Sequence, residues 1–151
     1  ISRDRDPDTS TMSESEAEAS FNDEDATAQE VAESLRKVGK VVNNLMARAD
    51  CIPFREPVDW KGLQLYDYPK IIPRLMDLGT IKRKLEKGKY PHVAACVADV
   101  RLVWRNCMTY NADGSDFYRL AESYSKRLEE RYQKLLDEFG AEVLRGAAAA
   151  P

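Results

Sequence analysis

The sequence has few of the residues that build metal sites and disulfide frameworks. Its 151 residues include one histidine and three cysteines. Cys51, Cys96 and Cys107 are odd in number, and their spacings of 45 and 11 residues match neither a CxxC pair nor a zinc pattern. We therefore expect no metal and no cofactor, and interpret the cysteines as small apolar residues in a reducing compartment. His92 has no partner acid or nucleophile beside it, which favours a structural or solvated role.

Long apolar runs and catalytic motifs are also missing. No apolar run reaches about 18 residues, so no transmembrane helix and no membrane partner are expected. The patterns GxSxG, HExxH, GxxxxGK[ST] and GxGxxG do not occur. Carboxylate pairs such as Glu129 and Glu130 lie in a stretch rich in Lys and Arg, where solvated surface charge is the better explanation. We expect a protein that is not an enzyme.

The net charge of −3 averages two unlike parts of the chain. Residues 1–25 carry nine acidic and two basic side chains, whereas the remaining 126 residues have a net charge of +4. The first 25 residues contain only three large apolar side chains, so we expect a disordered acidic tail at 1–25. The chain starts without Met and is interpreted as part of a longer protein. An acid follows three residues after several serines, a pattern that acidophilic kinases prefer: Ser13, Ser15 and Ser20.

A capping-box pattern marks the first predicted helix. Thr27 and Glu30 can each satisfy a free backbone N–H, and apolar residues then recur at steps of three and four. This periodicity predicts a helix over 27–49. From 51 to 75 the pattern breaks, because five proline or glycine residues interrupt it, yet the segment is strongly apolar. So long a hydrophobic connection is unusual in a small domain and predicts a function such as walling a pocket.

Three more amphipathic helices are predicted from caps and stop signals. Together with the first, they predict an all-α four-helix bundle over 26–140, followed by a flexible Ala-rich tail at 141–151. In an antiparallel bundle the first and third connections lie at the same end. The expected limits are Asp77 and Gly88 for the second helix, Pro91 and about Tyr110 for the third, and Ser115 or Asp116 and Gly140 for the fourth.

The apolar first connection and Asn111 can therefore meet around one cavity. An apolar wall with one amide suits a neutral ligand that carries a carbonyl, because the Asn NH₂ can donate to that oxygen. The same cavity disfavours a charged ammonium, which would be desolvated without a counter-ion. This difference distinguishes acetyl-lysine from lysine. The alternative is that Asn111 is a helix C-cap in the left-handed region, which asparagine tolerates.

Two stretches of the chain closely resemble a bromodomain, the acetyl-lysine-reading module. They are PFREPVDWKGLQLYDYPKIIPRLMDLGTIKRKLEKGKY and NCMTYNADGSDFYRLAESYSKRLEERY, and the resemblance extends from about Ala28 to Phe139. It implies a left-handed four-helix bundle whose first and third loops enclose the ligand. It also implies a monomeric binding module for acetylated lysine in histone tails or other nuclear proteins, a nuclear location, and binding of small-molecule acetyl-lysine mimics.

The resemblance also assigns roles to individual residues. Asn111 is expected to donate to the acetyl carbonyl, and Tyr68 to contact the same oxygen through a water. The alternative for Tyr68 and Phe54 is a place in the core. The resemblance places Pro53 and Phe54 at the shelf and Phe117 at the entrance as gatekeeper. It places Cys107 and Tyr110 on one side of the pocket. The apolar wall on the other side consists of Val58, Leu63 and Leu65, and these three residues can divide between core and pocket.

The sequence departs from the family pattern at two places. Bromodomains often have Trp where Ile52 stands, which leaves open how a peptide packs on the outer shelf. The usual Pro-Met-Asp before the second helix has Leu75 in place of Pro, which should mainly loosen a turn.

A second hypothesis is a structural or nucleic-acid-associated bundle that uses the basic run Lys82–Lys84. It would bind DNA in a salt-dependent manner. A net charge of +4 over 126 residues is a small bias for a nucleic-acid domain, so a solvated surface is favoured and nucleic acid is not expected as a direct ligand.

Overall fold

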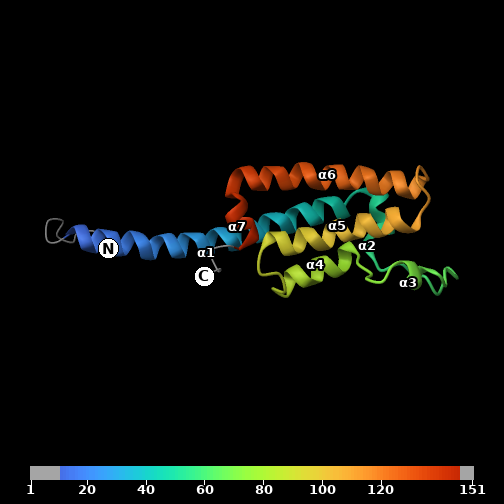
Figure 1. Ribbon diagram of the computed structural model, residues 1–151, viewed down its shortest axis with the longest axis horizontal. Coiled ribbons are helices and arrows are strands. Elements are labelled where there is room, and N and C mark those ends of the chain that lie inside the picture. Colours follow the sequence, from blue (N-terminus) through green and yellow to red (C-terminus); the bar gives the residue numbers. More distant parts are fainter. Residues whose placement is uncertain (1–10, 147–151) are drawn as a thin grey trace.

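The computed structural model describes the backbone of residues 11–146 and the side chains of residues 28–146. Within this part, helices α1, α4, α5 and α6 lie side by side (Figure 1), and no strand is present. The all-α bundle expected from the sequence is confirmed. No helix in this part has the length and apolar character needed to cross a membrane. The elements are α1 (Thr11–Met46), η2 (Ala49–Cys51), α2 (Ile52–Arg55), α3 (Tyr68–Ile71), α4 (Leu78–Glu86), α5 (Val93–Tyr110), α6 (Asp116–Phe139) and α7 (Ala141–Arg145).

Most of the predicted helix caps are present. Asp77 accepts a hydrogen bond from the Thr80 backbone N–H at 2.9 Å and caps α4. Gly88 follows the C-cap of α4 with φ of +67°, a backbone conformation that glycine adopts without steric cost. Ser115 caps α6. These local signals therefore set the limits of two bundle helices.

The predicted start of α5 is wrong by a small shift. Pro91 was expected in the first turn, but α5 begins at Val93 and His92 is its N-cap. The Nδ1 atom of His92 accepts a hydrogen bond from the Ala95 backbone N–H at 3.3 Å. A cap needs a side-chain acceptor, which proline lacks and a neutral imidazole supplies. His92 is therefore structural, as its lack of partners indicated.

Helix α1 begins at Thr11, well before the expected start at Thr27. The described backbone is thus helical over residues 11–25, where the sequence predicts disorder, and residues 1–10 lie outside the described part. Extending an existing helix costs much less than nucleating one, and the segment contains four Glu and two Ala, which favour helix. Acidic residues near a helix N-terminus are also favoured by its dipole. The serines proposed as kinase targets have side chains outside the described part.

The core runs along the bundle between α1, α4, α5 and α6. Its aromatic centre joins three elements, because the ring of Phe54 in α2 meets Trp104 of α5 at 5.0 Å and Tyr124 of α6 at 5.3 Å. Burial of each large apolar side chain contributes about 1.5–3 kcal/mol. This cluster fastens the start of the long first connection to the bundle.

The C-terminal segment closes the end of the bundle that lies far from α3 (Figure 1). Residues 141–151 were expected to be flexible, but 141–145 form α7, and its Val143 and Leu144 are buried. Gly140 makes the turn into α7 with φ of +86°. The prediction is therefore wrong for 141–145, and residues 147–151 lie outside the described part. Five residues are too few to display a helical period, so the burial arises from tertiary packing.

A polar cluster around Asp99 attaches the end of the first connection to the bundle. The Asp99 carboxylate of α5 accepts hydrogen bonds from Lys84 Nζ at 2.8 Å, Arg74 Nη2 at 3.1 Å and Tyr90 Oη at 2.6 Å. Burial by itself raises the pKa of Asp99, but the hydrogen bonds from Lys84 and Tyr90 outweigh it and hold that pKa below its ordinary value. The buried carboxylate is therefore ionised and paired at neutral pH.

Candidate functional site

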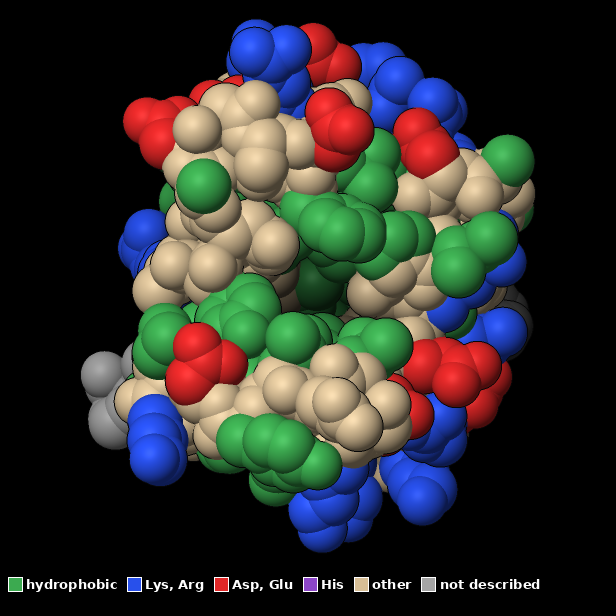
Figure 2. Space-filling view, turned by 90° about the vertical axis from the view of Figure 1, so that its right-hand side faces the viewer, with side chains coloured by type: hydrophobic (Ala, Val, Ile, Leu, Met, Phe, Trp, Pro, Cys, Tyr) green, Lys and Arg blue, Asp and Glu red, His purple; other side chains and the backbone are tan. Residues whose placement is uncertain are grey.

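A cavity of about 550 Å³ opens at the end of the bundle where the first and third connections meet. Figure 2 looks onto this end and shows a hollow lined by hydrophobic side chains, with Lys and Arg mainly at the periphery. The two connections thus meet as expected. All ten residues singled out in the sequence line this cavity: Pro53, Phe54, Val58, Leu63, Leu65, Tyr68, Cys107, Tyr110, Asn111 and Phe117.

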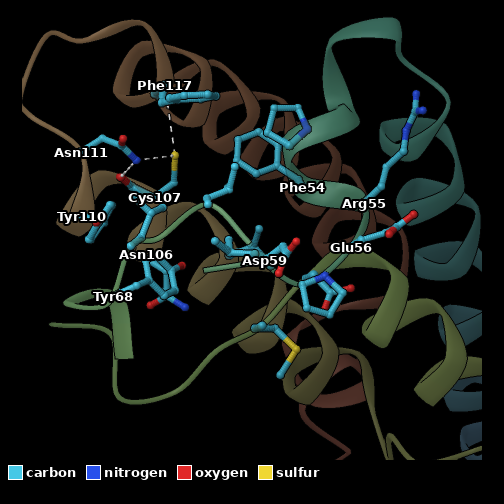
Figure 3. Close-up of a pocket in the computed structure, with 18 of the residues that line it drawn as sticks. Phe54, Arg55, Glu56, Asp59, Tyr68, Asn106, Cys107, Tyr110, Asn111 and Phe117 are labelled. Carbon is cyan, nitrogen blue, oxygen red and sulfur yellow. Dashed lines mark hydrogen bonds between the residues drawn. The ribbon is translucent and has the colours of Figure 1, made fainter. Parts of the chain in front are cut away.

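Asn111 follows the last residue of α5 and is half-buried at the cavity (Figure 3). Its Nδ2 atom donates to the Cys107 carbonyl oxygen at 2.9 Å. The same Nδ2 atom also contacts the Cys107 Sγ atom at 3.6 Å, and a thiol is a weak acceptor that a ligand carbonyl can replace. Asn111 is the C-cap residue, but with φ of −98° and ψ of 148° it is extended rather than left-handed. The left-handed alternative is therefore wrong, and the backbone conformation does not explain the choice of asparagine.

Tyr68 begins α3 and its side chain is only 6% exposed. It lies outside the main hydrophobic core, and no hydrogen bond of its hydroxyl occurs among the described residues. Its ring packs edge-on against Tyr110, with the ring centroids 4.8 Å apart. Burial raises the pKa of Tyr68, so the phenol is neutral at physiological pH and keeps its O–H donor. Tyr68 is thus a buried polar side chain at the cavity rather than a residue of the core.

The apolar lining is graded from the interior to the mouth. Phe54 belongs to both the core and the cavity. Val58 and Leu65 are half-buried, while Leu63 is 62% and Phe117 51% exposed. None of Val58, Leu63 and Leu65 joins the core, and all three line the cavity, where the resemblance places them. This gradient suits a ligand that enters from solvent and buries its tip.

Cys107 joins the two sides of the cavity wall that come from α5 and α6. Its Sγ atom donates to the Phe117 carbonyl oxygen at 3.3 Å, and burial raises the pKa of the thiol. Cys51 and Cys96 are buried, as the sequence predicted, and Cys107 is half-buried. Cys107 is therefore a neutral thiol that positions the start of α6.

The charged side chains that line the cavity either make hydrogen bonds within the fold or lie exposed at the mouth. Arg55 donates to the carbonyl oxygens of Met46 at 2.9 Å and Arg48 at 2.7 Å, and so caps the C-terminal end of α1. The buried carboxylate of Asp77 caps α4. Glu56 and Asp59 are exposed at the mouth. The interior of the cavity is therefore suited to a neutral group.

The family model described as Bromodomain matches residues 38–123, from within α1 to within α6. The chain belongs to the bromodomain family. Bromodomains are binding modules rather than a class of enzymes, and the family binds acetylated lysine in general.

Two relatives of this bromodomain come from Arabidopsis thaliana. The protein named Transcription factor GTE1 is 52% identical over 80 residues, which are 53% of this chain and 21% of that protein. Transcription factor GTE2 is 35% identical over 130 residues, which are 84% of this chain and 22% of that protein. The chain thus spans about a fifth of the length of these relatives.

Some residues that line the cavity of this bromodomain were not assigned to it from the sequence. Among them, Asn106 is 7% exposed and donates from Nδ2 to the Arg74 carbonyl oxygen at 2.8 Å. A polar residue on the same face of α5 as Val103 and Tyr110 is a signal that could have identified it. The others are Arg55, Glu56, Pro57, Asp59, Met76, Asp77 and Val103, while Ile52, which the resemblance places at the outer shelf, lines the cavity as well.

Proposed function

We propose that this bromodomain is a non-enzymatic reader of acetylated lysine in histone tails or other nuclear proteins. The observation that carries the proposal is the Asn111 amide beside an apolar cavity, because only the weak sulfur acceptor of Cys107 competes with a ligand for its second hydrogen. An acetyl group brings a carbonyl acceptor without charge, and the lysine methylenes can lie against the apolar lining. An unmodified ammonium would lose its hydration without gaining a paired counter-ion. The site therefore favours the acetylated side chain.

Tyr68 supports the same proposal. Its neutral hydroxyl makes no hydrogen bond to another described residue, so it can bind a water or a ligand in the cavity. A water held between this hydroxyl and the acetyl oxygen would satisfy both groups. The roles proposed for the other lining residues are apolar contact at the wall and, for Phe117, control of the entrance.

The names of the two relatives support a nuclear role in transcription, because both are called transcription factors. We extend this to the present chain as a proposal, with a monomeric domain and an acetylated peptide as the partner. Small molecules that present an acetyl-like carbonyl would compete for the same cavity.

The nucleic-acid hypothesis is less well supported. Lys84 of the basic run is paired with Asp99 at 2.8 Å and its Nζ atom lies 4.6 Å from the ring centroid of Tyr90. Its charge is therefore used within the fold, and only Lys82 and Arg83 remain exposed. Two exposed cations make a small electrostatic surface for DNA.

Calorimetric titration of acetylated and unmodified histone peptides tests the proposal. We expect wild-type affinity for the acetylated peptide on the order of micromolar or weaker, because one buried side chain offers modest contact. Asn111→Ala should weaken binding by about tenfold or more, since the carbonyl loses its donor. Asn44→Ala, exposed on α1, is the matched control and should bind like wild type. Equal binding by Asn111→Ala, or equal binding of the unmodified peptide, would contradict the proposal.

A further inference from the structure

One wall of the cavity is a short segment that has little packing of its own. Residues 67–74, here called the Tyr68 segment, contain the single turn α3 and lead toward α4. Their buried side chains are Tyr68 and Ile72. A helix of one turn is unstable by itself, and weakly packed loops open at small free-energy cost. Contacts from the rest of the fold must therefore keep Tyr68 in place.

The first attachment lies at the start of the segment. Tyr110 Oη donates to Asp67 Oδ1 at 2.7 Å, and the Tyr110 ring packs on Tyr68. The backbone oxygen of the same Asp67 accepts from the amides of Lys70 and Ile71, each at 3.0 Å. Tyr110 thus holds Asp67, the N-cap residue immediately before α3.

The second attachment lies at the end of the segment. Asn106 donates to the Arg74 carbonyl oxygen at 2.8 Å, while the Arg74 guanidinium pairs with the buried Asp99. Asn106 and Tyr110 are four residues apart on α5, so their side chains project from the same face of the helix. One face of α5 therefore holds both ends of the Tyr68 segment, and Figure 3 shows Tyr68, Asn106 and Tyr110 beside the cavity.

We propose that Asn106 and Tyr110 are positioning residues that keep the Tyr68 segment closed on α5, so that Tyr110 supports ligand affinity through Asp67. This inference rests on the proposed acetyl-lysine function. If the segment is closed for only a fraction of the time, the apparent affinity falls by that fraction. A wall held in its bound position also removes an ordering cost from binding.

Hydrogen exchange of the unliganded protein tests the attachment without any ligand. Tyr110→Phe keeps the ring that packs on Tyr68 and removes only the hydroxyl donor. We expect faster exchange at the amides of Lys70, Ile71 and Ile72, which are bonded within α3, and unchanged exchange in the centre of α5. Tyr132→Phe, half-buried on α6 away from the cavity, is the matched control and should leave these amides unchanged.

Titration with the acetylated peptide tests the link to binding. Tyr110→Phe should weaken affinity about two- to tenfold, the range for losing one hydrogen bond. Asp67→Ala should weaken it equally and the double variant no further, because both substitutions remove the same contact. Asp67→Asn, which keeps an oxygen acceptor, should stay close to wild type. Asn106→Ala should act in the same direction.

The outcomes separate this inference from the proposed function. If wild type does not bind acetylated peptide, the proposed function is wrong, while the exchange experiment still tests the attachment. If wild type binds but Tyr110→Phe changes neither exchange nor affinity, the attachment does not operate. If Tyr110→Phe loses affinity but its amides exchange at the wild-type rate, Tyr110 contacts the ligand directly. If its amides exchange faster but its affinity is unchanged, closure of the Tyr68 segment does not contribute to binding. Each of these three results overturns the positioning role.

Discussion

Removal of α7 should destabilise the protein although the sequence alone makes this segment look dispensable. A chain that ends at Gly140 loses the buried side chains of Val143 and Leu144, and Leu144 is 0% exposed. Burial of each such side chain contributes about 1.5–3 kcal/mol, so the truncation should cost about 3–6 kcal/mol. For a domain of this size, each kcal/mol lowers Tm by about 2–4 °C, which gives a fall of about 6–24 °C.

Thermal unfolding followed by circular dichroism measures this effect. Leu144→Ala alone should lose about 2–5 kcal/mol, because the neighbouring side chains cannot fully close the space that it leaves. Glu142→Ala, exposed in the same helix, is the matched control and should stay within about 0.5 kcal/mol of wild type. A truncated chain that melts with wild type would refute the burial argument. Below its melting transition, the truncated protein should still bind acetylated peptide normally, because α7 lies at the far end of the bundle.

Two further predictions concern polar side chains within the fold. Because the pKa of Asp99 is lowered in the folded state, its contribution to stability is complete above its unfolded pKa of about 4 and is lost as the pH falls through the folded value. Asp99→Asn should therefore lose about 1–3 kcal/mol at pH 7 and less in acid, as measured by urea unfolding at several pH values; a constant difference would contradict the ionic role. His92→Ala should lower the free energy of unfolding by about 1 kcal/mol, because α5 loses its cap. His92→Ser supplies a new cap acceptor and should restore most of that stability in thermal melts; equal destabilisation by both variants would show that the imidazole acts only by packing.

Helix limits could be predicted from the sequence wherever a local cap sets them. The side chains of Asp77 and Ser115 each accept a hydrogen bond from the backbone amide three residues later. The sequence pattern that starts each of these helices is therefore contained in four residues. The start of α1 had no such signal, because extension along an existing helix depends on small differences in propensity. Helix α7 is held by burial of Leu144 against elements distant in sequence, which no local pattern reveals.

The candidate site could be predicted in part. Asn111 and the apolar connection were expected to meet because antiparallel helices bring the first and third connections together, and the resemblance supplied the partners. The place of Asn106 could not be predicted in this way. Its hydrogen bond joins it to Arg74, 32 residues earlier, and the geometry of the long connection decides it.

The cavity lies at one end of the bundle, and α7 lies at the other. Figure 1 shows α1 extending from the end closed by α7, while the two connections that form the cavity lie at the other end. Any sequence joined before α1 or after α7 therefore enters the domain far from the mouth of the cavity. The fold can be inserted into proteins of different architecture without obstructing its binding face, and an affinity tag or fluorescent protein fused at either end should leave peptide access intact.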